Sequence, residues 1–227
     1  QRAAERARLQ AAIAQREVLV REVHHRIKNN LQGVAGLLQQ NAARHPELSA
    51  VLSEAVGQVQ AIAQVYGLQV GASGPLEVAG LLRAIAASVQ RTFGRPIGVA
   101  VAGAVPQLLP EAEAIPVALT VNELLTNAIK HGDGGDVTCR LAVHGGDVRI
   151  RIASAGTLPA GFDLAQVRGG VSGLGLVRAL LPRRSSRLTL LQQGDEVVAE
   201  VVLRPPSVQL PTEVAPGAAA AAAVQTA

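Results

Sequence analysis

The chain has few aromatic residues and almost no cysteine. Its 227 residues include one tyrosine, two phenylalanines, no tryptophan and a single cysteine, Cys139. One cysteine cannot form an internal disulfide, which excludes a disulfide-stapled fold. So few aromatic rings leave almost no surface on which nucleic-acid bases could stack. Although the formal charge is +4, the basic residues are scattered, and we expect no nucleic-acid partner.

Long apolar runs are also missing. No stretch approaches the roughly 20 apolar residues that cross a bilayer, and no signal peptide precedes the first helical pattern. We therefore expect no membrane contact within this chain. The hydrophobic content of 48% is enough for real cores in one large or two small domains. Because Gln1 already lies in a charged helical pattern, we expect the chain to be cut from a longer protein.

A long helix is predicted from about residue 9 to residue 40. Its apolar residues recur every seven positions, which is typical of a bundle or coiled-coil helix, and they are Ile13, Val20, Ile27 and Val34. In this heptad His24 lies on the flank of the apolar seam, and His25 faces away from it. The sequence therefore predicts an exposed His25.

Polar residues surround His25 along the same helix. Glu22 lies three residues before it and Asn29 four after, both within side-chain reach. A carboxylate that accepts one ring N–H leaves the other ring nitrogen more nucleophilic, so we expect Glu22 to orient His25. The alternative is that His24 and His25 are two solvated surface residues. A metal site is less favoured, because adjacent helical residues point about 100° apart.

A second helix carries the segment NELLTNAIKHG, residues 122–132. Glu123 and Asn127 are spaced i, i+4 and share one helical stripe. A carboxylate and an amide so placed can hold a hydrated magnesium ion, because magnesium prefers hard oxygen ligands and keeps most of its waters. Lys130 then supplies a positive charge for phosphate, with His131 beside it at the helix end.

A glycine-rich segment follows at residues 169–182, GGVSGLGLVRALLP. Glycines before a helix let backbone N–H groups approach phosphate at the helix N-terminus. Alone, such a loop is also typical of a flexible turn.

Together the three segments resemble a sensor histidine kinase. The first is similar to the phosphoacceptor box of the HWE/HisKA_2 type of dimerisation domain, in which HR precedes a hydrophobic residue and KN. The second resembles the N-box of the GHKL ATPase superfamily, and the third its second glycine box and ATP lid. The resemblance spans roughly residues 15–204.

The resemblance implies a role for each matching position. The phosphoacceptor histidine precedes the arginine, which makes it His25, with His24 as the alternative. The expected cofactors are ATP and Mg²⁺. Residues expected at the nucleotide, the metal or the catalytic step are Glu123, Asn127, Lys130, His131, Gly156, Gly173, Leu174, Gly175 and Leu176. Of these, Asn127 would ligate magnesium, Glu123 would order it through water, and Leu176 would begin the helix after the lid.

The first glycine box departs from the family pattern. Where the superfamily has an aspartate that accepts a hydrogen bond from the adenine amino group, this chain has Ser154, two residues before Gly156. A serine hydroxyl is shorter and uncharged. Losing one charge-assisted hydrogen bond costs about 1.5 to 3 kcal/mol, so we expect weakened ATP binding. Asp163 is a possible substitute.

The fold class that follows has two parts. Residues 1–70 are predicted to form an α-helical hairpin, with 1–14 as a signalling helix, and to dimerise into a four-helix bundle because two helices cannot close a core alone. Residues 71–75 are the expected hinge. Residues 76–205 are predicted to form an α/β sandwich with a mixed sheet and helices on one face. Residues 206–227, rich in proline and alanine, are expected to be a disordered tail.

The function expected from these features is ATP-dependent autophosphorylation of His25, followed by transfer to a response-regulator aspartate. The expected partners are a second copy, a receiver domain and an upstream sensor domain, all in the bacterial cytoplasm. Two alternatives stay open. The first is a nucleotide-poor phosphotransfer or dimerisation adaptor, which Ser154 favours. The second is a protein serine kinase of the same ATPase fold, which the histidine box disfavours.

Overall fold

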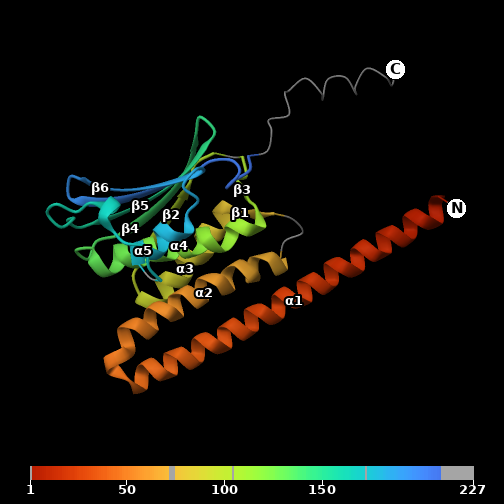
Figure 1. Cartoon of the computed structure of the whole chain (residues 1–227), viewed down its shortest axis with the longest axis horizontal. Coiled ribbons are helices and arrows are strands. Elements are labelled where there is room, and N and C mark those ends of the chain that lie inside the picture. Colours follow the sequence, from red (N-terminus) through yellow and green to blue (C-terminus); the bar gives the residue numbers. More distant parts are fainter. Residues whose placement is uncertain (1, 72–74, 104, 172, 211–227) are drawn as a thin grey trace.

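A helical hairpin and an α/β domain make up the described part of the chain (Figure 1). The computed structural model describes residues 2–71, 75–103, 105–171 and 173–210. The interior of the expected hinge, residues 72–74, therefore lies outside the described residues, as do residues 211–227 of the expected tail.

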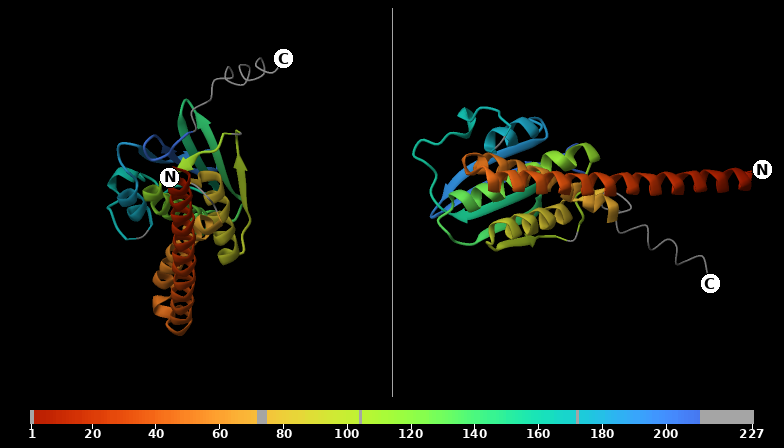
Figure 2. Two further views of the ribbon diagram at one scale, coloured as in Figure 1. Left: turned by 90° about the vertical axis from the view of Figure 1, so that its right-hand side faces the viewer. Right: turned by 90° about the horizontal axis from the view of Figure 1, so that it is seen from below.

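The hairpin consists of α1 (Arg2–Arg44) and α2 (Ser49–Gly71), joined by the 3-10 turn η1 (Pro46–Leu48). As expected, the first helix ends before Pro46, because the residue before a proline avoids the α region. The second helix begins at Ser49, two residues later than expected, since 46–48 form the turn. The N-terminal half of α1 projects beyond the rest of the molecule (Figure 2).

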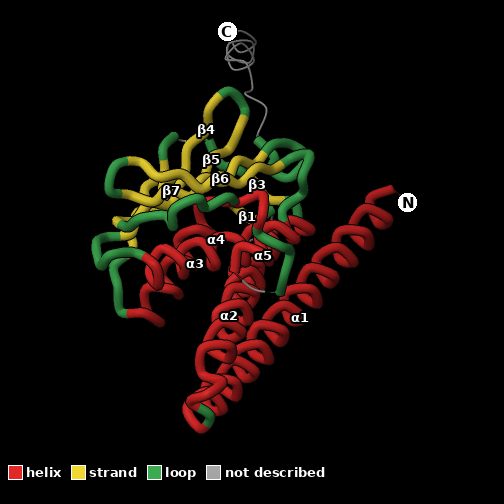
Figure 3. Tube along the Cα trace, turned by 60° about the vertical axis from the view of Figure 1, so that its left-hand side comes forward, coloured by secondary structure: helices red, strands yellow, loops and turns green. Residues whose placement is uncertain are grey.

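A mixed five-stranded sheet forms one layer of the α/β domain, and helices cover one of its faces (Figure 3). The strand order is β2-β4-β5-β7-β6, and only β2 and β4 pair in parallel. The strands are β2 (Ile97–Val101), β4 (Val137–His144), β5 (Asp147–Ala155), β6 (Ser186–Gln193) and β7 (Glu196–Leu203). The α/β sandwich predicted from the sequence is thus confirmed.

The helical layer contains α3 (Val78–Phe93), α4 (Glu111–His131) and the short α5 (Gly173–Leu180). The sequence predicts the helix that carries NELLTNAIKHG over about residues 111–131, and α4 confirms these bounds. A two-residue strand, β1 (Leu76–Glu77), precedes α3 and pairs with β3 (Leu108–Leu109); both were missed because such short strands leave no periodic pattern. The core between the layers is aliphatic, and its largest fully buried side chains include Leu81, Ile85, Leu125, Ile150 and Leu203.

The two glycines between β4 and β5 explain the register of that hairpin. Gly145 and Gly146 have φ angles of +57° and +85°. Two successive positive φ values are the geometry of a type I′ turn, which matches the twist of the flanking strands. The sequence predicts a hairpin at Gly145 and Gly146, and the pairing of β4 with β5 confirms it.

Cys139 lies on β4 inside the core, and its side chain is fully buried. Burial raises the pKa of its thiol to about 12, and only the thiolate reacts rapidly. We therefore expect Ellman's reagent at pH 8 to leave the native chain unmodified and to titrate one thiol per chain in denaturant. Rapid reaction of the native chain would contradict this burial.

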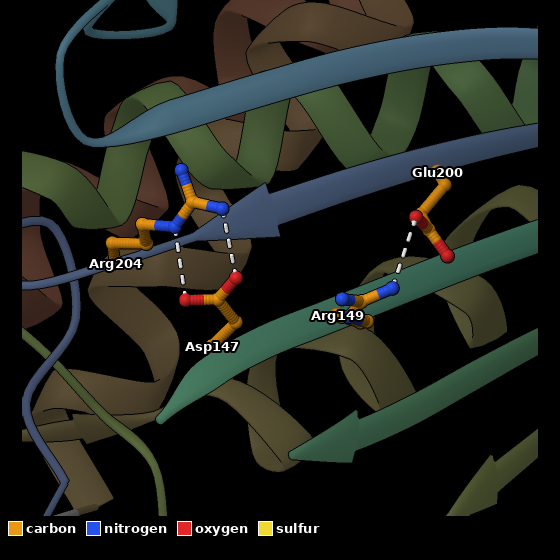
Figure 4. Close-up of polar contacts among 4 residues, drawn as sticks. All are labelled: Asp147, Arg149, Glu200 and Arg204. Carbon is orange, nitrogen blue, oxygen red and sulfur yellow. Dashed lines mark hydrogen bonds and ion pairs between the residues drawn. The ribbon is translucent and has the colours of Figure 1, made fainter. Parts of the chain in front are cut away.

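Ionic pairs cross the exposed face of the sheet (Figure 4). Arg204 donates from Nε and Nη2 to the two oxygens of Asp147, each at 2.9 Å. This hydrogen bonding lowers the pKa of the Asp147 carboxyl and raises the pKa of Arg204. Arg149 approaches Glu200 at 3.7 Å. Solvent-exposed pairs of this kind contribute little to the free energy of unfolding, so their main effect is on the alignment of neighbouring strands.

The hairpin is packed against the α/β domain through α2. Ala61 and Val65 are each only 1% exposed and belong to the same core cluster as the buried residues of α3 and α4. At Gly57 the helix α2 lies close to α4: a Cβ on Gly57 would lie 3.4 Å from Nδ2 of Asn122. The two parts therefore share buried apolar contacts in addition to the chain connection.

The described chain continues past the expected end of the α/β domain. Ser207 and Val208 are buried, and Gln209 forms a β-bridge with Leu108. The start of the disordered tail at residue 206 was therefore placed too early, because Val208 fills the core beside β3 despite the two prolines before it. Within the described residues, no helix is long and apolar enough to span a membrane.

Candidate functional site

A pocket of about 530 Å³ lies between α4, the sheet and the segment leading to α5. Its walls are mostly aliphatic, and within the described residues no acidic side chain lines it. The polar groups that line it come from Asn127, His131, Ser154 and Thr157, and Phe162 adds a phenyl ring. A concave apolar site with few polar groups is typical of a pocket for a small organic ligand.

The pocket brings together residues that are far apart in the sequence. Its walls include Asn127 and His131 from the second segment, Ser154 from the first glycine box, and Gly173 and Leu174 from the second. Gly156 lies directly after β5, and Gly175 and Leu176 lie in the first turn of α5. Five of the predicted positions, Asn127, His131, Ser154, Gly173 and Leu174, therefore line one pocket.

Ser154 lies near the end of β5 and is only 4% exposed. Its hydroxyl would be 3.5 Å from a Cβ placed on Gly132. Gly132 must stay glycine, because the same Cβ would lie 2.4 Å from the carbonyl oxygen of Ala128. Because Gly132 has no side chain, the pocket stays open beside Ser154.

Asp163 does not substitute for the missing aspartate. Its Oδ1 accepts a hydrogen bond from the backbone N–H of Ala165 at 2.8 Å and caps the 3-10 turn η2 (Leu164–Gln166). It is absent from the pocket walls. The possibility raised from the sequence is therefore wrong, because the carboxylate is used for local capping.

The second glycine box forms the start of α5. The helix begins at Gly173, whose φ is +58°, three residues before the predicted start at Leu176. Gly175 is tightly packed: a Cβ there would lie 2.6 Å from the carbonyl oxygen of Arg168. The start implied by the resemblance is late because Gly173 and Gly175, assigned there to the glycine box, already belong to the first turn of the helix.

Two residues that the sequence did not single out organise the segment before α5. Arg178 donates to the carbonyl oxygens of Leu164 and Ala165 at 3.0 and 2.8 Å, and to that of Val167. Gln192 accepts from the N–H of Leu158 at 2.9 Å and donates to the carbonyl of Gly156 at 3.0 Å. Arg178 lies in the glycine-rich segment 169–182, but the sequence does not show which carbonyls it contacts, and Gln192 lies in no recognisable motif.

Glu123 lies one turn before Asn127 on α4, and it is only 3% exposed. Burial raises the pKa of its carboxyl, and nearby Glu54 adds to this. Hydrogen bonds from Gln58 and from the backbone of Gly173, together with the charge of Lys130, act in the opposite direction and lower that pKa. Lys130 is exposed and lines a smaller hollow beside Glu123, between α2 and α4, instead of the main pocket.

The donor set fits a hydrated magnesium ion better than a fully caged metal. Asn127 offers an amide oxygen at the pocket wall, and Glu123 offers a carboxylate one turn away. Magnesium commonly binds through one or two such groups together with waters and substrate phosphates. Among the described residues, no group of three or more His, Cys, Asp or Glu side chains could hold a metal ion.

His25 is exposed on α1, as predicted, and His24 is half-buried. The His24 ring packs edge-on against Tyr66 of α2, with centroids 5.5 Å apart. Nδ1 of His25 lies 3.2 Å from Nδ2 of Asn29. Glu22 was expected to orient His25, but Oε1 of Glu22 accepts from Nε of Arg26 at 2.7 Å. That expectation is corrected: the stronger guanidinium partner occupies the carboxylate, and its hydrogen bond lowers the pKa of Glu22.

The histidine pair and the pocket lie at different ends of the molecule. None of the pocket's described walls comes from α1 or α2. His24 instead lines a hollow with Glu111, the first residue of α4. Asn127 lies sixteen residues further along that helix, which is about 24 Å at 1.5 Å per residue. In this conformation His25 is therefore out of reach of a phosphate bound beside Asn127.

Comparison with known proteins finds similarity to histidine kinases. Residues 22–92 match HisKA_2, described as histidine kinase. The chain is 30% identical over 207 residues to the sensor histidine kinase PdtaS of Mycobacterium tuberculosis, and 28% identical to that of Mycolicibacterium smegmatis. These matches cover 86% of the chain. The chain spans only 40% of the length of the first relative and 41% of the second.

Solved structures agree in fold. The histidine kinase domain of the blue-light activated histidine kinase EL346 from Erythrobacter litoralis superposes with a TM-score of 0.57 at 20% identity. The match covers 83% of this chain and 94% of that domain. A second EL346 structure gives a TM-score of 0.56 at 25% identity, covering 83% of this chain and 62% of that one.

Proposed function

Because this chain belongs to the HisKA_2 family of sensor histidine kinases, we propose that it is a kinase core that transfers phosphate from ATP to His25. The observation that carries the proposal is the coexistence of an exposed histidine on α1 and a pocket that joins Asn127 to the glycine-rich start of α5. An exposed histidine alone is commonplace, and so is an apolar pocket. Their joint presence supports phosphoryl transfer.

In this proposal the pocket binds the adenine and the start of α5 approaches the phosphates. The base packs against the aliphatic walls, near Ser154 at the inner end. Asn127, with Glu123 acting through water, would hold magnesium, which when bound neutralises charge on the phosphate oxygens. Lys130 lies beside Glu123, where it adds positive charge at the edge of the metal site. His131 lines the pocket at the end of α4.

The transfer step needs little help from a strong base. The lone pair on Nε2 of His25 attacks the γ-phosphorus in line, and the bond to the β,γ-bridging oxygen breaks to release ADP. Positioning and charge neutralisation supply most of the acceleration in such reactions. The structure places the Asn29 amide nitrogen 3.2 Å from Nδ1, an arrangement in which Nδ1 accepts and Nε2 carries the proton. For Nε2 to carry the lone pair, the Asn29 amide must rotate so that its oxygen accepts a hydrogen bond from a protonated Nδ1. After that rotation Asn29 would take the orienting role first assigned to Glu22.

The proposed partners are a second copy, a receiver domain and an upstream sensor. The α1 seam supports the second copy: Ile13, Val23 and Leu37 are 50%, 52% and 62% exposed. A bundle of two hairpins would bury this apolar stripe. The receiver aspartate would take the phosphoryl group from His25. A cytoplasmic location is part of the same proposal, because ATP and receiver domains are found there.

The adaptor remains the second candidate, since no acidic group among the described residues of the pocket is available to anchor the base. Its uncharged lining favours weaker nucleotide binding. The Asn127 and Gly173 walls favour the kinase, because an adaptor has no use for a phosphate site. The serine kinase is not favoured, since the family match includes the histidine box.

Calorimetric titration with ATP and magnesium tests the proposal. We expect saturable binding by the wild-type chain, weakened by about one to two decades relative to a site with a carboxylate at position 154. Asn127→Ala removes the amide ligand and should lower the affinity measured in magnesium. No binding at millimolar ATP would overturn the kinase and leave the adaptor.

A further inference from the structure

Gln58 of α2 connects three segments that are distant in the chain. Its Nε2 donates to Oε1 of Glu123 and to the carbonyl oxygen of Val171, both at 3.2 Å. Glu123 belongs to α4, and Val171 lies just before α5. One amide of the helical hairpin therefore contacts both the candidate metal site and the segment that borders the nucleotide pocket.

The Glu123 carboxylate depends on this amide because it is removed from water. It is 3% exposed, and a buried charge without hydrogen bonds is costly. Gln58 and the backbone of Gly173 both hydrogen-bond to it. Withdrawing α2 would remove one of these donors and expose the carboxylate, which could then be satisfied by water or by a hydrated ion.

The packing around Gln58 supports a docked arrangement. The preceding residue, Gly57, lies against Asn122, the residue before Glu123. One turn further along α2, Ala61 is buried in the α/β core. Contacts on both sides of Gln58 thus hold α2 on the α/β domain, but Gly57 and Ala61 are small residues and neither donates a side-chain hydrogen bond. The two hydrogen bonds of Gln58 form only when α2 occupies one specific position on α4.

The docked arrangement also keeps the reacting groups apart. His24, the neighbour of His25, lines a hollow with Glu111 at the N-terminal end of α4, and Asn127 lies about 24 Å further along that helix. Phosphoryl transfer requires reacting atoms about 3 to 3.5 Å apart. Transfer to His25 of the same chain therefore requires the contact between α2 and α4 to break.

We propose that Gln58 is a positioning residue that holds the resting state, by hydrogen-bonding Glu123 and Val171 while α2 is docked on α4. One consequence of this inference, slower phosphorylation of His25 while α2 is docked, rests on the proposed kinase function. The docking itself requires no activity. The hydrogen bond to Glu123 has a charged acceptor and is worth at least about 1.4 kcal/mol, which corresponds to about tenfold in an equilibrium.

Hydrogen exchange of the nucleotide-free chain tests the docking directly. With Gln58→Ala we expect about tenfold faster exchange at the backbone amides of α2 and of α4 around Glu123, and no change in the β4–β5 hairpin. Gln58→Leu should behave in the same way while keeping side-chain volume. The matched control is Gln60→Ala: Gln60 lines the neighbouring hollow, but no hydrogen bond from it to the α/β domain is found among the described residues.

Two outcomes would overturn the inference. One is exchange in the Gln58 variants equal to that of Gln60→Ala. The other is faster exchange throughout the domain, which would mean general destabilisation. Autophosphorylation with labelled ATP is a separate readout, expected to rise up to about tenfold in Gln58→Ala. If the chain proves inactive, the proposed function fails, but localised exchange still supports the docking role of Gln58.

Discussion

Replacing His25 by glutamine is expected to abolish incorporation of label from γ-labelled ATP, to below about 1% of the wild-type rate. Glutamine keeps the length and polarity of the side chain on an exposed helix face, so the helix and the dimer should persist. Its amide nitrogen is not nucleophilic, because its lone pair is delocalised. The measurement is labelled-phosphate incorporation per chain, with size-exclusion chromatography to verify the oligomeric state.

His24→Gln provides the matched control one residue away. His24 packs on Tyr66, so its loss should lower thermal stability but leave labelling largely intact. Full labelling of the His25 variant would remove His25 from its role. Loss of labelling in the His24 variant alone would transfer the role to His24, the alternative already recognised from the sequence.

The second large effect is expected from Ser154→Asp. A carboxylate at this position could accept a charge-assisted hydrogen bond from the adenine amino group. That bond is worth about 1.5 to 3 kcal/mol, so the affinity for ATP should rise about ten- to a hundredfold. Isothermal calorimetry measures this rise. GTP is the control ligand, because the guanine carbonyl at the equivalent place offers no hydrogen to a carboxylate.

Burial makes this substitution unfavourable in the free chain. Position 154 is 4% exposed, and an unpaired buried carboxylate destabilises the fold. We therefore expect a lower Tm for Ser154→Asp without nucleotide and a larger Tm increase on adding ATP than for the wild type. Asp163→Asn should leave ATP affinity unchanged, since Asp163 caps η2. An unchanged ATP affinity of Ser154→Asp would place the base elsewhere in the pocket.

The sequence predicted most elements correctly because their signals are local. The bounds of α4 follow from its apolar stripe, and the β4–β5 hairpin follows from Gly145 and Gly146. The errors fall where local signals conflict. Glycines at the start of α5 read as loop, and the prolines before Val208 read as the start of a tail, although Val208 is buried by distant parts of the chain.

The candidate site shows the same division. The family resemblance implied that Asn127, Ser154 and Gly173 would meet at the nucleotide, and the pocket brings them together. Spacing could not decide between two side-chain partners on one helix: Glu22 can reach both His25 and Arg26, and the choice depends on which hydrogen bond is stronger. Nor could it predict the contacts of Arg178 with the carbonyls of Leu164 and Ala165, because these partners lie outside the glycine-rich segment.

By itself, the sequence determined the kinds of chemistry available to this protein: an exposed histidine on a heptad helix, a carboxylate–amide pair one turn apart, glycines before a helix, and a serine where the family has an aspartate. These properties follow from residue type and helical or strand periodicity. Only the tertiary structure decided which groups are within reach of each other. The docking of α2 on α4, the hydrogen bond from Gln58 to Glu123 and the separation of His25 from the pocket depend on contacts between residues far apart in the chain, which no local pattern encodes.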